Sequence, residues 1–319
     1  MNDGAAVMRR DFTIIIPAYN EALVVPDLVR ELRAAFLKYG LDGEVLLVDD
    51  GSTDGTAGLA EKEAADWERF EVVRHRVNRG KTEAILTAAE HASEGLLILF
   101  DADLQYSTEE IPRFLECLDD GWDIVTGRKT GPYEKKAVST VYNRLSRLVF
   151  DLPVSDLNSM KAFRAEVLEG LQLRHDWHRF FVALAHAQGA TVTEIDIDLH
   201  PRRAGEAKYG GRRRVLVGLL DLVSVWFLLI FSRKPLLLFG GTGLVLASFG
   251  LFVGAVTVYL RFLHPMFGFD AYIPPMGYRP LLYLVMLLAT LGFLLFGFGL
   301  VSEQVAQVRH ELEASRRRD

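Results

Sequence analysis

An apolar run that stops abruptly at two aspartates most constrains what this chain can fold into. Residues 95–105 read GLLILFDADLQ, so a glycine opens the run and Asp101 and Asp103 close it. A short run rich in Leu and Ile is typical of a buried parallel strand, whose carboxyl end would deliver both acids to the edge of a sheet. Ligands bind at that edge in open α/β sheets.

The two aspartates suggest a divalent metal site. Carboxylates one residue apart offer hard oxygen ligands to Mg²⁺ or Mn²⁺, and a bound ion could hold the diphosphate of an activated donor. On this pair alone, a solvated loop after the strand explains the sequence equally well, because aspartates are common in turns. The segments upstream favour the binding site.

Strand and helix patterns alternate through the N-terminal third. Short apolar runs predict three strands before the one above, at Phe12–Pro17, Glu44–Val48 and Phe70–Arg74. Asn20, in the turn AYNE, is expected to cap a helix from Glu21 to about Tyr39. This alternation predicts an α/β fold with a mostly parallel, doubly wound sheet.

The turns after these strands carry groups that suit a nucleotide. The segment DDGSTDGT, Asp49 to Thr56, places acids, hydroxyls and glycines on a strand-to-helix turn. Backbone N–H groups, the helix dipole and carboxylates can grip a nucleotide there. The segment NRGK, Asn78 to Lys81, leads into another helix, and His75 and His91 are interpreted as surface residues.

Five motifs follow in the order and spacing of one enzyme family: IIIPAYNE, VDDGSTDGT, NRGK, DADLQ and the later Gly127-Arg128. The chain resembles the family-two glycosyltransferases, which have the Rossmann-like GT-A fold. Three later segments, VSDLNSMKAFR, HRF and PRRAGEAKYG, resemble the polyprenyl-phosphate branch, of the dolichol-phosphate mannose synthase type. Two departures are Ser159-Met160, where many relatives have Ser-Gly-Phe, and Ala207, where many have Ser.

The resemblance implies an inverting glycosyltransferase that moves a sugar from a UDP- or GDP-sugar to a polyprenyl phosphate at the cytoplasmic face of a membrane. A phosphate monoester has a second pKa near 6, so the acceptor is largely anionic at neutral pH and no strong general base is required. Positive charge must instead bring two phosphate groups together. The donor sugar, its nucleotide and the isoprenoid are left open.

The resemblance also implies roles for individual residues. Donor binding is expected at Pro17, Tyr19, Glu21, Asp49, Asp50, Lys81, Asp101, Ala102 and Asp103. Asp103 is the preferred direct ligand of Mg²⁺ or Mn²⁺, with Asp101 beside it. The expected catalytic residues are Asp101, Asp103, Asp156 and Arg128. The acceptor phosphate is expected to meet Arg128, Arg144 and Arg202, because a guanidinium can bind phosphate through two donors.

Several of these residues have structural alternatives. Arg144, on a helix expected from about 138 to 150, is explained almost as well by a surface position. Asp156 belongs by resemblance near the donor sugar, but it could instead cap a helix that carries Lys161–Leu168. Roles at sugar or phosphate are left open for four residues: Asp176, His178, Arg179 and Lys208.

Two stretches are long enough to span a bilayer. Residues 236–260 are uncharged for 25 residues and residues 281–301 for 21, whereas about 20 cover the hydrocarbon core. A glycosyltransferase domain is therefore expected at 1–211, an interfacial amphipathic helix at 212–235, a two-helix transmembrane module at 236–302 and a basic tail at 303–319. Gly250 and Gly254 have a spacing suited to a contact between helices.

Basic residues set the expected topology. Arg212 to Arg214, Arg233 and Lys234 precede the first span, and Arg316 to Arg318 end the chain, so both termini are expected in the cytoplasm. The start of the sequence lacks the apolar core of a signal peptide, and a single cysteine suits a reducing compartment. The expected location is the cytoplasmic (inner) membrane. Expected partners are a nucleotide sugar, a polyprenyl phosphate and the membrane, but no nucleic acid, and a homo-oligomer is left open.

Two other functions are compatible with parts of the sequence. A polysaccharide synthase would share the donor chemistry, but the Gln-x-x-Arg-Trp motif of such enzymes is absent from this chain. An inactive, membrane-anchored protein that binds sugar nucleotides would have no physical reason to keep several acids together in these turns.

Overall fold

The computed structural model describes residues 9, 11–130, 152–154, 156–157, 159–169, 171, 173–174, 177–201, 223–227, 235–267 and 279–316 of the 319-residue chain. They belong to two compact units, Met1–Gly218 and Leu219–Asp319. Each unit is described by itself.

The first unit is built on one mixed sheet. In the described residues its strands run in the order β3-β2-β1-β4-β6-β5-β7. Their bounds are β1 (Phe12–Ala18), β2 (Glu44–Asp49), β3 (Phe70–Arg74), β4 (Leu96–Leu99), β5 (Ile124–Thr130), β6 (Lys161–Arg164) and β7 (Val192–Asp198). Only the pairs made by β6, with β4 and with β5, are antiparallel among these strands. The expectation of a mostly parallel sheet is confirmed.

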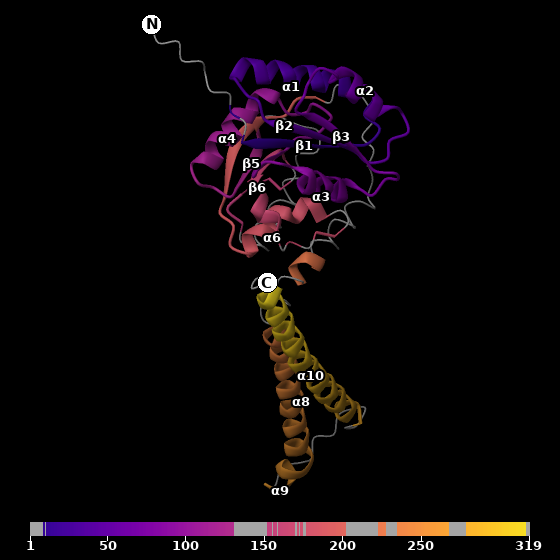
Figure 1. Ribbon diagram of the computed structural model, residues 1–319. Helices are drawn as coiled ribbons and strands as arrows, with labels where there is room; N and C mark the ends of the chain where they lie inside the picture. The colour runs from indigo at the N-terminus through magenta and orange to yellow at the C-terminus, as the bar shows by residue number, and fades with distance from the viewer. Residues whose placement is uncertain are drawn as a thin grey trace. The chain divides into compact units, whose positions relative to one another are not determined.

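Helices cover both faces of this sheet (Figure 1), with α1 and α2 over one face and α3 and α6 over the other. The helices of this unit are α1 (Val25–Tyr39), α2 (Thr56–Glu63), α3 (Lys81–His91), α4 (Ile111–Asp119) and α6 (Phe181–Ala187), with short 3₁₀ turns η1 (Thr108–Glu110), η2 (Ala165–Leu168) and η3 (Trp177–Phe180). Ile14, Ile15 and Ile16 of β1 are all completely buried, as expected of a central strand packed on both faces.

The first helix begins later than the sequence suggests. The expectation that Asn20 caps a helix starting at Glu21 is wrong: α1 begins at Val25, and no side chain caps it. Asn20 instead adopts a left-handed backbone conformation, with φ of 51°. Its side-chain oxygen accepts a hydrogen bond from the N–H of Thr53, at 2.9 Å. The residues of AYNE therefore form a loop that is tied to the next turn of the chain.

The segment after Met160 also differs from expectation. Lys161–Arg164 form the strand β6, and Ala165–Leu168 form a 3₁₀ turn, so Asp156 caps no helix there. Lys161 pairs with Leu99 of β4, and Phe163 with Ile124 of β5. Helix and strand are hard to distinguish by periodicity in so short an apolar run, and long-range pairing decides the outcome.

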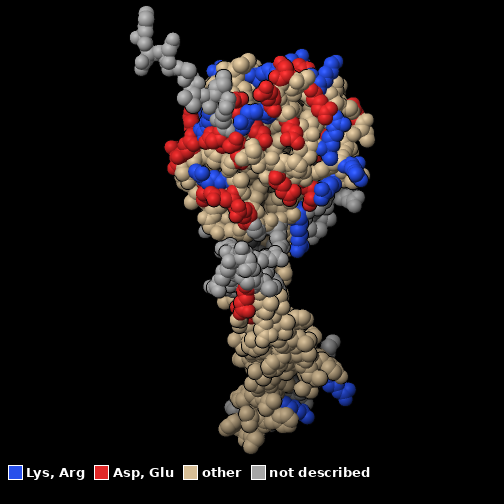
Figure 2. Space-filling model, in the orientation of Figure 1, with Lys and Arg blue, Asp and Glu red and all other residues tan. Residues whose placement is uncertain are grey.

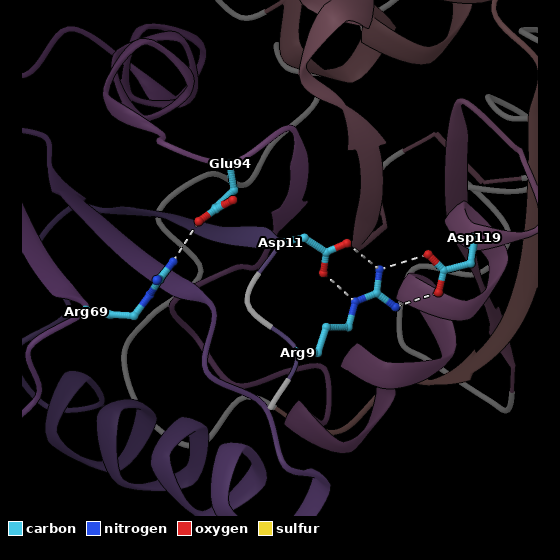
Figure 3. A network of polar contacts seen from close by, with 5 residues as sticks. All are labelled: Arg9, Asp11, Arg69, Glu94 and Asp119. Carbon is cyan, nitrogen blue, oxygen red and sulfur yellow. Dashed lines mark hydrogen bonds and ion pairs between the residues drawn. The ribbon is translucent and has the colours of Figure 1, made fainter. Parts of the chain in front are cut away.

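A network of ion pairs closes the edge of the sheet where β1, β3 and β4 begin (Figure 3). Arg9 binds Asp11 through Nε at 2.8 Å. It also holds both oxygens of Asp119, at the end of α4, at 2.6 and 2.9 Å. Arg69 pairs with Glu94 at 2.9 Å. The pairs of Arg9 join the residues before β1 to the end of α4, and the pair of Arg69 joins the starts of β3 and β4, all at the edge opposite the carboxyl ends of the parallel strands.

The second unit contains two helical segments that are long and apolar enough to cross a membrane, Leu236–Leu263 and Arg279–Val308. The first consists of η4 (Leu236–Gly240), α8 (Gly241–Val258) and η5 (Tyr259–Leu263) and continues into α9 (His264–Met266), and the second lies in α10 (Arg279–Arg316). Only 22% and 11% of their most apolar windows are buried within the protein, unlike the core helices of a soluble domain. Charged side chains are scattered over the first unit and sparse along these helices (Figure 2).

Glycines bring the two long helices together. A Cβ added to Gly292 of α10 would lie 2.6 Å from the backbone nitrogen of Ala247, and one added to Gly243 would lie 2.5 Å from the carbonyl oxygen of Gly292. The expected contact at Gly250 and Gly254 is confirmed, because their Cβ positions would lie 3.0 Å from Leu288 and 3.4 Å from Val285. Small residues permit such close backbone approach between helices.

The second helix runs beyond the expected span. Helix α10 continues to Arg316, so residues 303–316, which were expected to form a tail, extend this helix. Glu303 accepts a hydrogen bond from the backbone N–H of Leu236 at 3.1 Å, which caps the start of the first apolar helix. Of the expected interfacial segment before residue 235, residues 223–227 are helical and the rest lies outside the described residues.

Replacing Gly292 by Ala should destabilise the helical unit, because the new methyl group would meet the backbone of α8. Gly297→Ala, further along the same helix, is the matched control, because its Cβ position has no atom within 4 Å apart from those of its own helical turn. In detergent, Gly292→Ala should lower the thermal midpoint of the helical unit, with a cost of about 1–3 kcal/mol. Gly297→Ala should leave it unchanged or raise it slightly. Equal effects of the two changes would contradict the close approach.

Candidate functional site

The carboxyl ends of four adjacent parallel strands bring the sequence motifs together. Strands β3, β2, β1 and β4 are neighbours in that order, so the segments after them share one edge of the sheet. AYNE follows β1, DDGSTDGT spans the end of β2, NRGK comes after β3 and the two aspartates follow β4. The chain builds β1, β2 and β3 outward in one direction and then returns to place β4 on the other side of β1, so the strand order reverses between β1 and β4. Ligands bind at such a switch point.

The antiparallel strand β6 adds a further segment to this edge. Because β6 starts where β4 ends, with Lys161 opposite Leu99, the residues just before β6 arrive beside Asp101. Asp156 belongs to this segment and is 4% exposed. It pairs with Lys129 of β5 at 3.4 Å.

The first two turns are joined by hydrogen bonds between backbone and side chains. The backbone N–H of Asn20 donates to the hydroxyl of Ser52 at 2.8 Å, and that of Glu21 donates to the hydroxyl of Thr56 at 2.9 Å. With the bond from Thr53 to Asn20, these contacts fix AYNE against DDGST. These hydrogen bonds hold the backbone of Asn20 in its left-handed conformation, and such sparsely populated conformations are typical of functional sites.

Gly51 lets the second turn pack against the segment after β3. Its φ is +73°, and a Cβ at this position would lie 2.6 Å from the carbonyl carbon of Val77. Only glycine combines that conformation with so close an approach. The turn after β2 and the loop that leads to NRGK consequently form one surface.

Asp50 connects these two turns. Its Oδ1 accepts hydrogen bonds from the backbone N–H of Arg79 at 2.8 Å and from Nδ1 of His75 at 2.7 Å, and its Oδ2 accepts one from the N–H of Gly80 at 2.8 Å. The interpretation of His75 as a surface residue is wrong, because its side chain is 6% exposed. A carboxylate has about four acceptor positions, so one remains after these three bonds. Direct contact of Asp50 with a donor stays a prediction, as does that of its buried neighbour Asp49.

Lys81 and Asp101 form the ion pair at the centre of the edge. The ammonium of Lys81, the first residue of α3, lies 2.5 Å from Oδ1 of Asp101. Burial raises the pKa of Asp101, but the charge and the hydrogen bond of Lys81 outweigh it and bring this pKa below its usual value. Asp101 is therefore ionised at neutral pH. Asp103, one residue beyond Ala102, is 8% exposed.

A buried lysine lies behind this pair. Lys161 is 3% exposed, and its ammonium donates to the carbonyl oxygens of Ser159 at 2.9 Å and Leu157 at 3.3 Å. Burial and the charge of Lys81 lower the pKa of Lys161 to about 8, against the opposing charges of Asp101 and Asp156. Lys161 therefore stays largely cationic at pH 7 and offsets part of the negative charge of the site.

His178 and Tyr106 complete the described cluster. The hydroxyl of Thr82 lies 3.2 Å from both Nδ1 and the backbone nitrogen of His178. Burial, followed by the charge of Lys81, lowers the pKa of His178 well below its usual value, so the ring is neutral at pH 7. Arg179 also lowers this pKa. Burial raises the pKa of Tyr106 well above its usual value, and Asp101 raises it further, so the phenol keeps its proton.

The residues expected at the acceptor phosphate are only partly described. Arg128 is half exposed and binds two carboxylates of β7, Asp196 through Nε at 2.5 Å and Glu194 through Nη1 at 3.2 Å. Its contact with an acceptor stays a prediction. Four of the other residues singled out in the sequence lie outside the described residues: Arg144, Asp176, Arg202 and Lys208.

The carboxylates of Asp101 and Asp103 suit a hard cation that also binds a substrate. No group of three or more His, Cys, Asp or Glu side chains that could hold a metal occurs among the described residues. Mg²⁺ commonly uses one or two carboxylates together with substrate phosphates, so the donor set fits an ion that arrives with a diphosphate.

Reasoning from the sequence alone missed four residues of this edge: His75, Tyr106, Lys129 and Lys161. Lys161 sits in a segment that was expected to be a helix, so its position behind Asp101 could not be foreseen. Lys129 follows the Gly127-Arg128 motif directly, and this position next to a recognised motif, on β5, could have indicated that it belongs to the site. His75 follows the last residue of β3, as Asp50 follows β2, and neighbouring strand ends lie close together in a parallel sheet.

Comparisons with known proteins agree with this geometry. The sequence pattern described as glycosyl transferase family 2 matches residues 13–186. An undecaprenyl-phosphate 4-deoxy-4-formamido-L-arabinose transferase of Klebsiella pneumoniae is 30% identical over 310 residues, which are 95% of this chain and 90% of that protein. A protein of the same name from Salmonella paratyphi A is 29% identical over 322 residues, or 98% and 93% of the two chains.

Solved structures share the fold of the first unit. Glucosyl-3-phosphoglycerate synthase from Mycobacterium tuberculosis, in complex with Mn²⁺, UDP-glucose and phosphoglyceric acid, has a TM-score of 0.52 and 17% identity, covering 67% of this chain and 80% of that one. The same enzyme with Mg²⁺ and UDP has a TM-score of 0.52 and 18% identity. At this identity the likeness shows the fold, and the expected GT-A architecture is confirmed.

Lys161 should leave a signature in the pH dependence of stability. Its pKa falls from 10.5 unfolded to about 8 folded, so the unfolded chain binds more protons between these values and stability rises with pH there. The buried charge costs about 3 kcal/mol at pH 7 and about 1 kcal/mol at pH 9.5. Relative to wild type, the free energy of unfolding of Lys161→Met should therefore fall by about 2 kcal/mol between these pH values.

Chemical denaturation of the full chain in detergent at pH 7 and pH 9.5 measures this difference. Lys62→Met, which removes an exposed lysine of α2, is the matched control for the loss of a charge. A difference between wild type and Lys161→Met that stays constant with pH would contradict the burial of this ammonium.

Proposed function

The chain belongs to glycosyl transferase family 2, and on this premise we propose that it transfers a sugar from a nucleotide sugar to a polyprenyl phosphate, with inversion at the anomeric carbon. The observation that carries this function is the match to undecaprenyl-phosphate sugar transferases over both units, 95% of the chain and more. A relative that shared only the first unit would say nothing of the acceptor.

The donor is proposed to lie across the carboxyl edge of the sheet. Asp49, at the end of β2, would face the base and ribose, and the edge after β4 would face the diphosphate. Lys81 is the described cation nearest to Asp101, so a donor phosphate that approaches Asp101 also meets a positive charge. Pro17, Tyr19, Glu21 and Ala102 belong to the same edge and are proposed as further contacts.

Asp103 and Asp101 would hold a Mg²⁺ or Mn²⁺ ion, with Asp103 as the direct ligand. When bound, such an ion supplies positive charge that stabilises the leaving diphosphate. Asp101 is already paired with Lys81, and the resemblance to the family favours Asp103 as the direct ligand. The charge of Lys161 interacts favourably with those of Asp101 and Asp156 and so lowers the cost of placing acids at this edge.

The transfer itself requires little proton chemistry. An oxygen of the polyprenyl phosphate attacks the anomeric carbon as the bond to the nucleoside diphosphate breaks, and the electron pair leaves with that diphosphate. Because the acceptor is already anionic, the site must mainly attract and orient two phosphates. Arg128, Arg144 and Arg202 are proposed for the acceptor. Arg128 would share its charge between Glu194, Asp196 and the acceptor phosphate.

The second unit is proposed to hold the enzyme in the inner membrane. The end of the first span and the start of the second carry Arg261 and Arg279. The opposite ends are flanked by nine basic residues: Arg212, Arg213, Arg214, Arg233, Lys234, Arg309, Arg316, Arg317 and Arg318. This excess favours cytoplasmic termini and a catalytic unit, residues 1–211, on the cytoplasmic side. The segment 212–235 would then lie in the interface, where its basic residues attract anionic lipid.

A lipid-transfer assay tests the function. The purified full chain is incubated with undecaprenyl phosphate, Mn²⁺ and, in turn, radiolabelled UDP- and GDP-sugars, including both nucleotide forms of the 4-deoxy-4-formamido-L-arabinose that the relatives' names contain. Label that moves into the organic phase and is released by mild acid supports the proposal. Hydrolysis of every donor without lipid product, or a polymeric product, would refute it in favour of another class of glycosyltransferase.

Asp103→Asn should abolish transfer while the fold stays intact. The change removes one negative charge from the proposed cation site but keeps the size of the side chain, so transfer should fall roughly a hundredfold or more. Asp66→Asn, at an exposed turn after α2 where Asp66 pairs with Arg33, is the matched control and should be fully active. Transfer by Asp103→Asn within tenfold of wild type, with the same dependence on Mn²⁺, would rule out Asp103 as the metal ligand.

A further inference from the structure

We propose that His75 is a positioning residue of the donor site, which acts through Asp50 to hold the segment Arg79–Gly80 so that Lys81 faces Asp101. The proposal deepens the proposed function and rests on it, because the site that it positions is the donor site. No comparison assigns a role to His75.

The first step is the fixed orientation of the ring. Nδ1 of His75 lies 2.7 Å from Oδ1 of Asp50, and Nε2 lies 3.0 Å from the hydroxyl of Thr87 on α3. An ionised carboxylate only accepts hydrogen bonds, so Nδ1 carries a proton and donates. Thr87 engages the opposite nitrogen, and the ring is thereby held at both ends inside the protein.

The second step is the grip of Asp50 on the loop before α3. Its two oxygens accept the backbone N–H groups of Arg79 and Gly80, both at 2.8 Å. Gly80 is the N-cap of α3 and no side chain caps this helix directly. The negative charge of Asp50 thus lies beside a helix start, where the helix dipole favours it.

The loop held by Asp50 leads directly into Lys81, which is proposed to meet the donor diphosphate. Lys81 follows Gly80 directly and is the first residue of α3, so the position of the two N–H groups sets the position of its side chain. Its ammonium meets Asp101 at 2.5 Å. Helix α3 takes part at both ends of this network, because Thr87 of α3 holds the ring of His75 and the ring in turn helps to position Lys81 of α3.

Loss of the His75 ring should weaken binding of the nucleotide sugar more than binding of the polyprenyl phosphate. Asp50 is 3% exposed, so water cannot easily replace the hydrogen bond from His75, and a buried carboxylate that loses such a bond is left undersatisfied. The carboxylate would shift, and Arg79, Gly80 and Lys81 would shift with it. These groups serve the donor diphosphate, whereas the arginines proposed for the acceptor lie elsewhere in the sequence.

The kinetic test compares His75→Leu, His75→Asn and His91→Leu in the full-length enzyme. His75→Leu should raise the KM for the nucleotide sugar about tenfold or more and change the KM for polyprenyl phosphate less than twofold. His75→Asn, whose amide nitrogen can replace Nδ1 as the donor to Asp50, should restore most of the loss. His91→Leu makes the same substitution at an exposed position of α3 and should match wild type.

Thr87→Val is a milder variant that keeps the bond between His75 and Asp50 but frees the other end of the ring. It should raise the KM for the nucleotide sugar in the same direction by about threefold, and it carries the test if His75→Leu does not fold. An unchanged donor KM in the folded variants, equal effects on both substrates, or no rescue by His75→Asn would overturn the proposal.

Hydrogen exchange of the backbone amides measures how firmly Asp50 holds the N–H groups of Arg79 and Gly80, and it requires no catalytic turnover. Peptides that cover residues 78–83 should exchange faster in His75→Leu than in wild type and recover in His75→Asn, whereas the strands should keep their protection. Unchanged exchange of this segment would overturn the proposal even if transfer is normal. Conversely, absence of transfer by the wild-type enzyme would refute the proposed function, while the exchange data would still decide whether His75 holds the loop.

Discussion

The gathering of charge at the carboxyl edge of the sheet is the constraint on which the rest of this structure depends. Asp49, Asp50, Asp103, Asp156 and Lys161 are all buried there, and an unpaired buried charge costs several kcal/mol. Among the described residues, the chain meets that cost with lysines, His75, backbone N–H groups and, for Lys161, backbone carbonyl oxygens. Because each partner comes from a different strand or turn, the acids can be buried only when the whole sheet has formed.

Much of this edge could be predicted from the sequence, because buried parallel strands can be recognised as short apolar runs. The strands that lead to Ala18, Asp49 and Arg74 lie within a residue of their expected ends. Their order along the edge then follows from alternation with helices. The two aspartates after β4 were identified for the same reason.

What could not be predicted depends on pairing between distant segments. Nothing local in Lys161–Arg164 distinguishes a strand from a helix, and only its neighbours β4 and β5 make it one. The burial of His75 likewise depends on Asp50 and Thr87, which are 25 and 12 residues away in the chain. The loop at Asn20 replaced an expected helix cap because Ser52 and Thr53 offered its polar groups better partners.

The direction of β6 has a consequence for how such enzymes can diversify. Strand β5 ends at Thr130 and β6 begins at Lys161, and because the two strands are antiparallel, both points lie on the same edge. The two ends of the connection between them therefore meet at the edge that carries the candidate site. An insertion between these ends need not change any strand register, because the closure cost of a flexible loop rises by only about 0.6 kcal/mol for each doubling of its length. Related chains can thus differ in the length of this connection while β1 to β4, whose ends carry most of the residues proposed for the donor, keep their positions.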